Sequence, residues 1–285
     1  PYTTLFRSPL MPPLADLMPF IAALLAAGVL AGLLAGLFGI GGGAILVPIF
    51  FHVFGLLGIS DAVRMHLALG TSLAIIVPTS IRSFMEHRKK NADAVDIDLL
   101  KGWIIAVPLG TMIAAVVAAW SSSTELRIIF AVISLLLALR MIFNRASWQL
   151  GDDLPKNPVK FLVGTGIGIL SGLMGIGGGV MNNTFMTLYG RSIHQAVATS
   201  SGVGVLISLP GLIGYVWGGW GEPGLPPFST GYINWMAVAL LIPVTLLMAP
   251  YGARLAHALS KRQLEFGFAL FLVGISIQFF LSVFA

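Results

Sequence analysis

The sequence contains no cysteine, which excludes disulfides, thiolate metal sites and a thiol nucleophile. Charge is also scarce, because Asp, Glu, Lys and Arg make up 9% of the 285 residues, against about 25% in an average soluble domain. No polar interval is long enough to form a sizeable soluble domain. Instead, 57% of the residues are hydrophobic, the mean hydropathy is +0.94, and apolar runs of about 20 residues alternate with short polar loops. This composition predicts an all-α polytopic membrane protein.

The distribution of charge further limits the classes of function that are possible. No Asp or Glu lies in the middle of a predicted span, which argues against a carboxylate proton relay or a carboxylate-lined cation site. The net charge of +5 comes from loop residues, as is typical of cytoplasmic loops, so no nucleic-acid partner is expected. We also expect no metal and no cofactor.

The N-terminal segment, residues 1–17, is predicted to be a tail outside the membrane fold. Its first eight residues, PYTTLFRS, look like a translated sequencing adapter, so we expect residues 1–8 to be an artefact and the native start to lie near Met11. The apolar run that follows has no basic segment before it and no small-residue cleavage site. It is therefore predicted to be a first span and not a removable signal.

The chain is predicted to be a duplication. When Gly39 is placed on Gly175, every glycine of the segment 28–43 falls on a glycine of the segment 164–179. Further along, HLALGTS (residues 66–72) matches HQAVATS (residues 194–200). We expect repeat 1 at 18–143, a cytoplasmic linker at 144–158 and repeat 2 at 159–285, all within one integral membrane domain.

Each half contains five apolar segments, so the fold class predicted here has about ten transmembrane segments, some of them short or broken. The segments span 18–38, 43–57, 62–82, 98–120, 125–143, 159–174, 179–190, 194–217, 232–255 and 263–284. Because five is odd, the second half must enter the membrane from the opposite side. If the chain starts outside, all Lys and Arg residues except Arg7, Arg64 and Arg127 fall inside. Inverted repeats of this kind are common in secondary transporters.

Two glycine clusters, GIGGGAILVP (residues 39–48) and GIGGGVMNNT (residues 175–184), interrupt these apolar runs. The segment after the first cluster would make a helix of only about 21 Å, against a hydrocarbon core of about 30 Å. We interpret each cluster as a helix break at membrane depth, where the free N–H groups of the next helix favour an anion. Close helix packing or a hinge remains the alternative. Nucleotide-binding motifs need a different spacing or a lysine, and neither is present.

Residues around these breaks are the candidate substrate-binding set. Hydroxyls in membrane helices often bind only their own backbone, and paired amides can simply join helices, so both alternatives remain open. The predicted set comprises the backbone of Gly41, Gly42, Gly43, Ala44, Gly177, Gly178, Gly179 and Val180, the hydroxyls of Thr71, Ser72, Thr199 and Ser200, and the amides of Asn182 and Asn183. His66 and His194 occupy matched positions, where they serve either as helix caps or interface residues, or as a proton-linked gate.

The paired motifs GLFGIGGGAILVP (residues 36–48) and GLMGIGGGVMNNT (residues 172–184), each followed by A-x-x-T-S, resemble the sulfite exporter TauE/SafE family. The resemblance extends over about 18–284. It implies a permease, often an exporter, for sulfur-containing anions such as sulfite, thiosulfate or organosulfonates such as sulfoacetate, in the bacterial plasma (inner) membrane. The second motif departs from the first, with Thr184 in place of Pro48 and the asparagine pair beside it.

The hypothesis is therefore a secondary transporter that works by alternating access around a midplane site, with a small anion and the lipid bilayer as its partners. An anion channel on the same fold is the alternative. A membrane-embedded hydrolase using Ser200 and His194 is disfavoured, because six residues of helix place these side chains on different faces. We thus expect no enzymatic activity.

Overall fold

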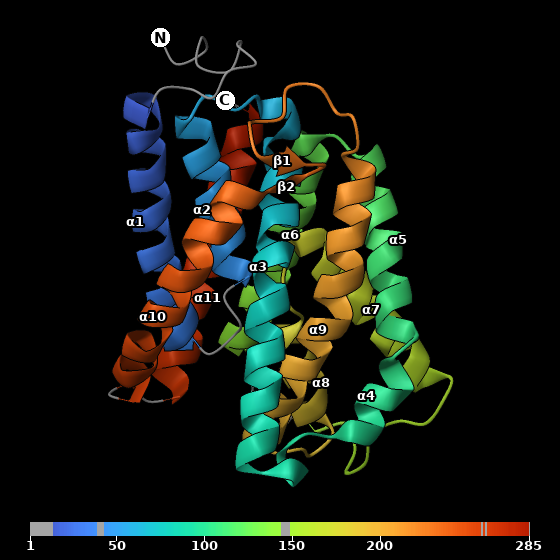
Figure 1. Cartoon of the computed structure of the whole chain (residues 1–285). Helices are drawn as coiled ribbons and strands as arrows, with labels where there is room; N and C mark the ends of the chain where they lie inside the picture. The colour runs from blue at the N-terminus through green and yellow to red at the C-terminus, as the bar shows by residue number, and fades with distance from the viewer. Residues whose placement is uncertain (1–13, 39–42, 144–148, 258, 260, 285) are drawn as a thin grey trace.

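The computed structural model describes residues 14–38, 43–143, 149–257, 259 and 261–284, and these fold almost entirely into helices (Figure 1). The prediction of a helical membrane protein is confirmed. A short antiparallel pair, β1 and β2, joins α9 to α10. The elements are α1 (Leu14–Phe38), α2 (Gly43–Leu56), α3 (Asp61–Lys90), η2 (Ala92–Ala94), α4 (Ile97–Trp103), α5 (Ala106–Trp120), α6 (Ser123–Phe143), α7 (Val159–Met174), α8 (Gly179–Leu188), α9 (Ile193–Gly218), β1 (Ser229–Thr230), β2 (Ile233–Asn234), α10 (Trp235–His257) and α11 (Lys261–Phe284).

Five helices within the described ranges, α3, α6, α9, α10 and α11, are long and apolar enough to cross a membrane. A sixth span results if α4 and α5, which are bent by 46° at their junction, count as one. The helices α2 and α7 and the Ile21–Leu34 part of α1 are apolar but shorter. The structure therefore supports a polytopic membrane protein, while ten segments remain a prediction.

Some predicted boundaries need correction. The segment predicted as a single helix at 98–120 is broken at Ile104 and Ile105. Pro108 explains the break, because its nitrogen carries no hydrogen to donate to the carbonyl of Ile104 and its ring would clash with that carbonyl. The helix predicted at 179–190 ends at Leu188, since Gly190 has a φ of 73°. The helix predicted from 232 begins only after strand β2.

Helices of the two halves pack against one another in matched pairs. The helix α1 packs against α10, and α7, its predicted counterpart, packs against α5; α3 pairs with α9, and α6 with α11. Figure 1 shows α3 and α9 running in opposite directions, with the start of α1 and the end of α11 on the same side of the molecule. We call this the terminal side, and the opposite side, where α6 ends and α7 begins, the linker side. This pairing is the arrangement that a duplication predicts, and the inverted repeat itself stays a prediction.

Glycines allow the close contacts within the pairs. A Cβ atom on Gly32 of α1 would lie 2.9 Å from the Cα of Thr245 in α10. A Cβ atom on its predicted counterpart, Gly168 of α7, would lie 3.0 Å from the backbone nitrogen of Thr111 in α5 and closer still to the carbonyl oxygen of Val107. Small residues bring helix backbones together in this way where no water is expelled to drive association.

Candidate functional site

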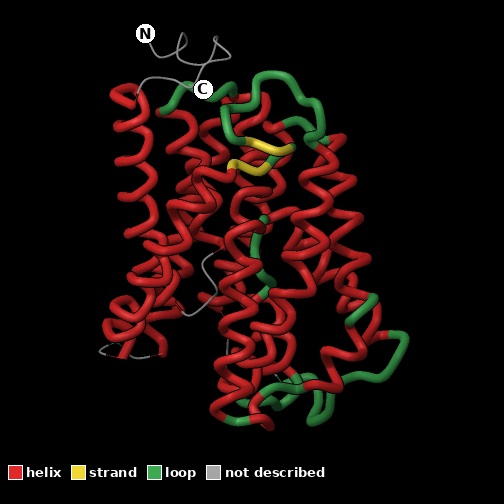
Figure 2. Tube along the Cα trace, viewed as in Figure 1, coloured by secondary structure: helices red, strands yellow, loops and turns green. Residues whose placement is uncertain are grey.

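The second glycine cluster forms a helix break inside the protein, as the sequence predicts. The helix α7 ends at Gly175 with a φ of 62°, and α8 begins after Gly178 with a φ of 70°. In this left-handed region a side chain would cost about 1–2 kcal/mol, which explains the two glycines. The four residues 175–178 are all buried. Figure 2 shows them as a short loop surrounded by helices.

The start of α2 contacts this break. A Cβ atom on Gly43 would lie 2.7 Å from the Cα of Ile176 and 3.0 Å from the carbonyl oxygen of Gly175. Ser72 of α3 donates a hydrogen bond of 2.8 Å to that same carbonyl. Ala44 is buried beside Gly43. The start of α2 therefore contacts the break at the side where α7 ends, and Gly41 and Gly42 lie outside the described residues.

The break lies between α3 and α9. A Cβ atom on Gly177 would lie 3.2 Å from Ile76 of α3 and 3.7 Å from the Cα of Gly204 in α9. The first intrahelical bond of α8 runs from Asn182 N to Gly178 O, at 2.9 Å. The N–H groups of Gly179 and Val180 precede this bond, so they have no partner within their own helix. They are the predicted anion donors that α8 offers.

The two adjacent amides and one predicted hydroxyl form a directed hydrogen-bond chain. Asn182 Nδ2 donates to Ser200 Oγ at 2.7 Å, and Ser200 Oγ donates to Asn183 Oδ1 at 2.6 Å. Asn182 is fully buried, and its Oδ1 has no partner among the described residues. Asn183, by contrast, is partly exposed. The structure thus brings together three residues that the sequence singles out.

The two threonines hold helix starts in the opposite half. Thr71 Oγ1 accepts from Asn234 N at 3.1 Å, and Thr199 Oγ1 accepts from Asp96 N at 2.9 Å. Asn234 and Asp96 in turn accept, through Oδ1, the N–H of the residue three positions on, each at 2.9 Å. Each threonine therefore fixes the cap of a fourth-segment helix. Sequence analysis missed Asp96 and Asn234, although an Asp or Asn just before an apolar run is a typical N-cap signal.

Comparisons with known proteins identify the family. The family model described as "Sulfite exporter TauE/SafE" matches residues 24–279. This chain belongs to the sulfite exporter TauE/SafE family. Among its relatives, a Haemophilus influenzae protein is 33% identical over 86% of this chain and 92% of its own length. A Methanocaldococcus jannaschii protein is 31% identical over 86% of this chain and 83% of its own length.

Both relatives are named "Probable membrane transporter protein", as is YunE of Bacillus subtilis, which is 25% identical over 79% of this chain and 83% of its own length. No solved structure matches the chain significantly. Together with the family, these names and the apolar helices establish an integral membrane transporter.

The two histidines predicted as a possible gate in this TauE/SafE protein, His66 and His194, lie at opposite ends of the bundle. His66 is buried near the terminal side, with Nε2 3.0 Å from Ala118 O and 2.9 Å from Ser121 O. Because both partners are carbonyls, Nε2 carries a proton and caps the end of α5. His194 is exposed at the start of α9. The structure therefore does not bring the pair together, and Ser200 is bonded to asparagines and not to His194.

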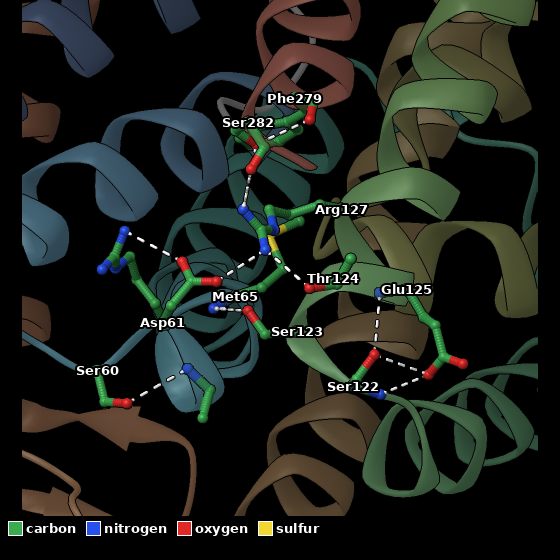
Figure 3. A network of polar contacts seen from close by, with 12 residues as sticks. Ser60, Asp61, Met65, Ser122, Ser123, Thr124, Glu125, Arg127, Phe279 and Ser282 are labelled. Carbon is green, nitrogen blue, oxygen red and sulfur yellow. Dashed lines mark hydrogen bonds and ion pairs between the residues drawn. The ribbon is translucent and has the colours of Figure 1, made fainter. Parts of the chain in front are cut away.

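A group of charged residues lies near the terminal side, and sequence analysis missed it. Arg127 donates to Asp61 at 2.7 Å and to Ser282 O at 2.9 Å, while Arg64 lies 3.3 Å from the other carboxylate oxygen of Asp61 (Figure 3). Both guanidinium groups lie over the ring of Phe51, at 5.5 and 5.2 Å from its centroid. We call these five residues the terminal-side cluster. Its two arginines, Arg64 and Arg127, are exceptions to the inside bias of charge, and that exception is the sequence signal that could have identified the cluster.

Proposed function

We propose that this transporter carries small sulfur-containing anions, such as sulfite, thiosulfate or an organosulfonate like sulfoacetate, and that it exports them across the bacterial plasma membrane. The observation that carries the proposal is the contact between Gly43 and the residues Gly175 and Ile176. It places the start of α2 against the four-residue loop that leads into α8, so the two helix starts would lie close to one another. Two helix starts at one place offer backbone donors and two positive dipole ends to a single anion.

The side chains around the break suit an anion without a permanent counter-charge. The described residues nearest to Gly177 and Gly178 are Ile76, Val203, Gly204 and Ile207, with the hydroxyls of Ser80 and Ser171 within 4 Å of an added Cβ. No carboxylate is among these neighbours to repel a negative substrate. An oxyanion needs several convergent donors, because each hydrogen bond to a charged group contributes about 1.5–3 kcal/mol. The N–H groups of α8 and the amide of Asn183 would supply them.

Alternating access is the mechanism we propose for this site. The break lies between α3 and α9, which belong to opposite halves and pack against each other. Rocking of one half against the other would expose the same donors first to one side and then to the other.

The proposal is tested by flux into liposomes containing the purified protein. The panel is sulfite, thiosulfate, sulfoacetate, sulfate and acetate, with and without a pH gradient. Asn183→Leu should weaken the apparent affinity for the transported sulfur anion about tenfold, since about 1.4 kcal/mol corresponds to one decade. Thr165→Val is the matched control, because the Thr165 hydroxyl binds only Phe161 O of its own helix, at 3.1 Å.

Equal apparent affinities for the sulfur anion in wild type and Asn183→Leu would show that the Asn183 amide does not bind the substrate. Transport of acetate in preference to every sulfur anion would overturn the substrate class. A sustained current far above transporter turnover would identify a channel instead.

A further inference from the structure

One face of α8 is polar and partly open. Between Gly179 and Thr187, the partly exposed positions are Gly179, Asn183, Thr184 and Thr187, while the intervening residues 180–182 and 185–186 are buried. The spacing of Gly179, Asn183 and Thr187 is four residues, which aligns them along one side of the helix. This stripe runs from the glycine break toward the linker side. Polar side chains avoid the hydrocarbon of a bilayer, so the stripe faces water or a polar ligand and not lipid tails.

The matching helix α2 is closed at the equivalent positions. Under the alignment that places Gly39 on Gly175, the stripe residues correspond to Gly43, Val47 and Phe51, and all three are buried. Phe51 lies beneath the guanidinium groups of the terminal-side cluster. Among the described residues, the equivalent positions are therefore covered on α2 and partly exposed on α8.

Arg140 stands beside the open stripe. It lies in the last turn of α6, is half-buried, and donates from Nη1 to the hydroxyl of Thr184. In the part of the chain that the structure describes, no carboxylate lies within ion-pair distance of this guanidinium. A half-buried charge that has lost part of its hydration is stabilised by a counter-ion. A planar guanidinium is well suited to bind an oxyanion through two parallel hydrogen bonds.

We propose that Arg140 is an anion-binding residue at the linker-side entrance, and that it captures the substrate before the anion moves along the stripe to the break. This inference rests on the proposed function for the identity of the anion. The same guanidinium could hold the phosphate of an anionic lipid headgroup. We assign it to a small anion from water, because its hydrogen-bond partner Thr184 is a partly exposed polar residue that adjoins Asn183 of the stripe.

The test uses the absence of native cysteine. Thr187→Cys introduces a single thiol at the linker-side end of the stripe, where the native hydroxyl binds only carbonyls of its own helix. Its reaction rate is measured in phosphatidylcholine liposomes with two methanethiosulfonate reagents, one carrying a sulfonate and one a trimethylammonium group. The ratio of the anionic to the cationic rate should fall at least fivefold when Arg140→Gln is added, and Arg140→Lys should restore it. Arg88→Gln is the control, since Arg88 is an exposed basic residue at the end of α3, packed over Phe84.

If the thiol at position 187 reacts with neither reagent, water does not reach the stripe and the proposal is wrong. A ratio that Arg140→Gln leaves unchanged, or that Arg88→Gln lowers equally, would overturn the role of Arg140. If the Arg140 dependence disappears when phosphatidylglycerol is added to the liposomes, the guanidinium holds a lipid headgroup and the proposal fails. The thiol reaction rates do not depend on the flux panel. If the rate ratio depends on Arg140 while Asn183→Leu keeps the wild-type affinity, the substrate site at the break is wrong and the entrance at Arg140 stands.

Discussion

Asp61→Asn removes the only carboxylate within ion-pair distance of Arg127 among the described residues. The Arg127 side chain is 6% exposed and that of Asp61 is 49% exposed, with 2.7 Å between Nη2 and Oδ2. Breaking a fully buried pair costs about 3–5 kcal/mol, whereas an exposed pair contributes about 0.2–1 kcal/mol. This pair is half-buried, and Arg127 keeps its bonds to Thr124 and Ser282. We therefore expect Asp61→Asn to lower the free energy of unfolding by about 2 kcal/mol, a value between the two limits.

Thermal unfolding of the purified protein measures this loss. About 2 kcal/mol should lower the midpoint by roughly 4–8 °C for a chain near this size. Glu86→Gln is the matched control, because Glu86 pairs with Arg82 at 3.0 Å while both side chains are about 60% exposed (61% and 60%). The control should change stability by less than about 0.5 kcal/mol.

A double-mutant cycle separates the ion pair from other effects. Arg127→Met removes the charge, so Asp61→Asn should cost much less in that background, with a coupling energy of about 2 kcal/mol, as for other contacting pairs. A midpoint for Asp61→Asn no lower than that of Glu86→Gln would refute the reasoning. So would a coupling energy within the error of the cycle, because the two side chains would then act independently.

Two further predictions concern the break and the orientation. Gly178→Ala should destabilise the protein by about 1–2 kcal/mol, because φ is +70° and the new Cβ would lie 2.5 Å from Ile207 Cδ1. Gly274→Ala should stabilise it by up to about 1 kcal/mol in the same unfolding assay, since nothing lies within 4 Å of that position in α11; the reverse order would contradict the strain argument. Single cysteines at Ser122 and Asn91 should react with an impermeant thiol reagent from opposite faces of intact cells, and labelling of both from one face would contradict the predicted orientation.

The fold class and the helix break at 175–178 could be predicted from the sequence, because both depend on local chemistry. Long apolar runs determine where helices cross a bilayer, and glycines accept the left-handed angles of Gly175 and Gly178. The break at Ile104 depends on local chemistry too. Pro108 indicates this break in the sequence, but the apolar composition of the segment favoured a prediction of one continuous helix.

The partners of the site residues could not be predicted, because they depend on how distant segments pack. Thr71 binds a backbone group 163 residues away, and Thr199 binds one 103 residues away. A hydroxyl in an apolar span looks the same in sequence whether it holds a helix cap or faces a substrate. The hydrogen bonds that link Asn182, Ser200 and Asn183 were easier to anticipate from the sequence. The helices α8 and α9 are neighbours in sequence, and amides in a short apolar helix need hydrogen-bond partners nearby.

The two halves differ most where the proposed path reaches the two sides of the membrane. Thr187 ends the open stripe, and the equivalent Phe51 lies beneath Arg64 and Arg127 near the terminal side. In the alternating-access cycle proposed above, opening the terminal side would have to move Arg127 away from Asp61 or Ser282, because these bonds join α6 to α3 and α11. About 2 kcal/mol in that contact corresponds to roughly a thirtyfold change in the ratio of the two states. Under the predicted duplication, the two halves would supply the paired helix starts, while the side chains that differ between them would decide which side is closed.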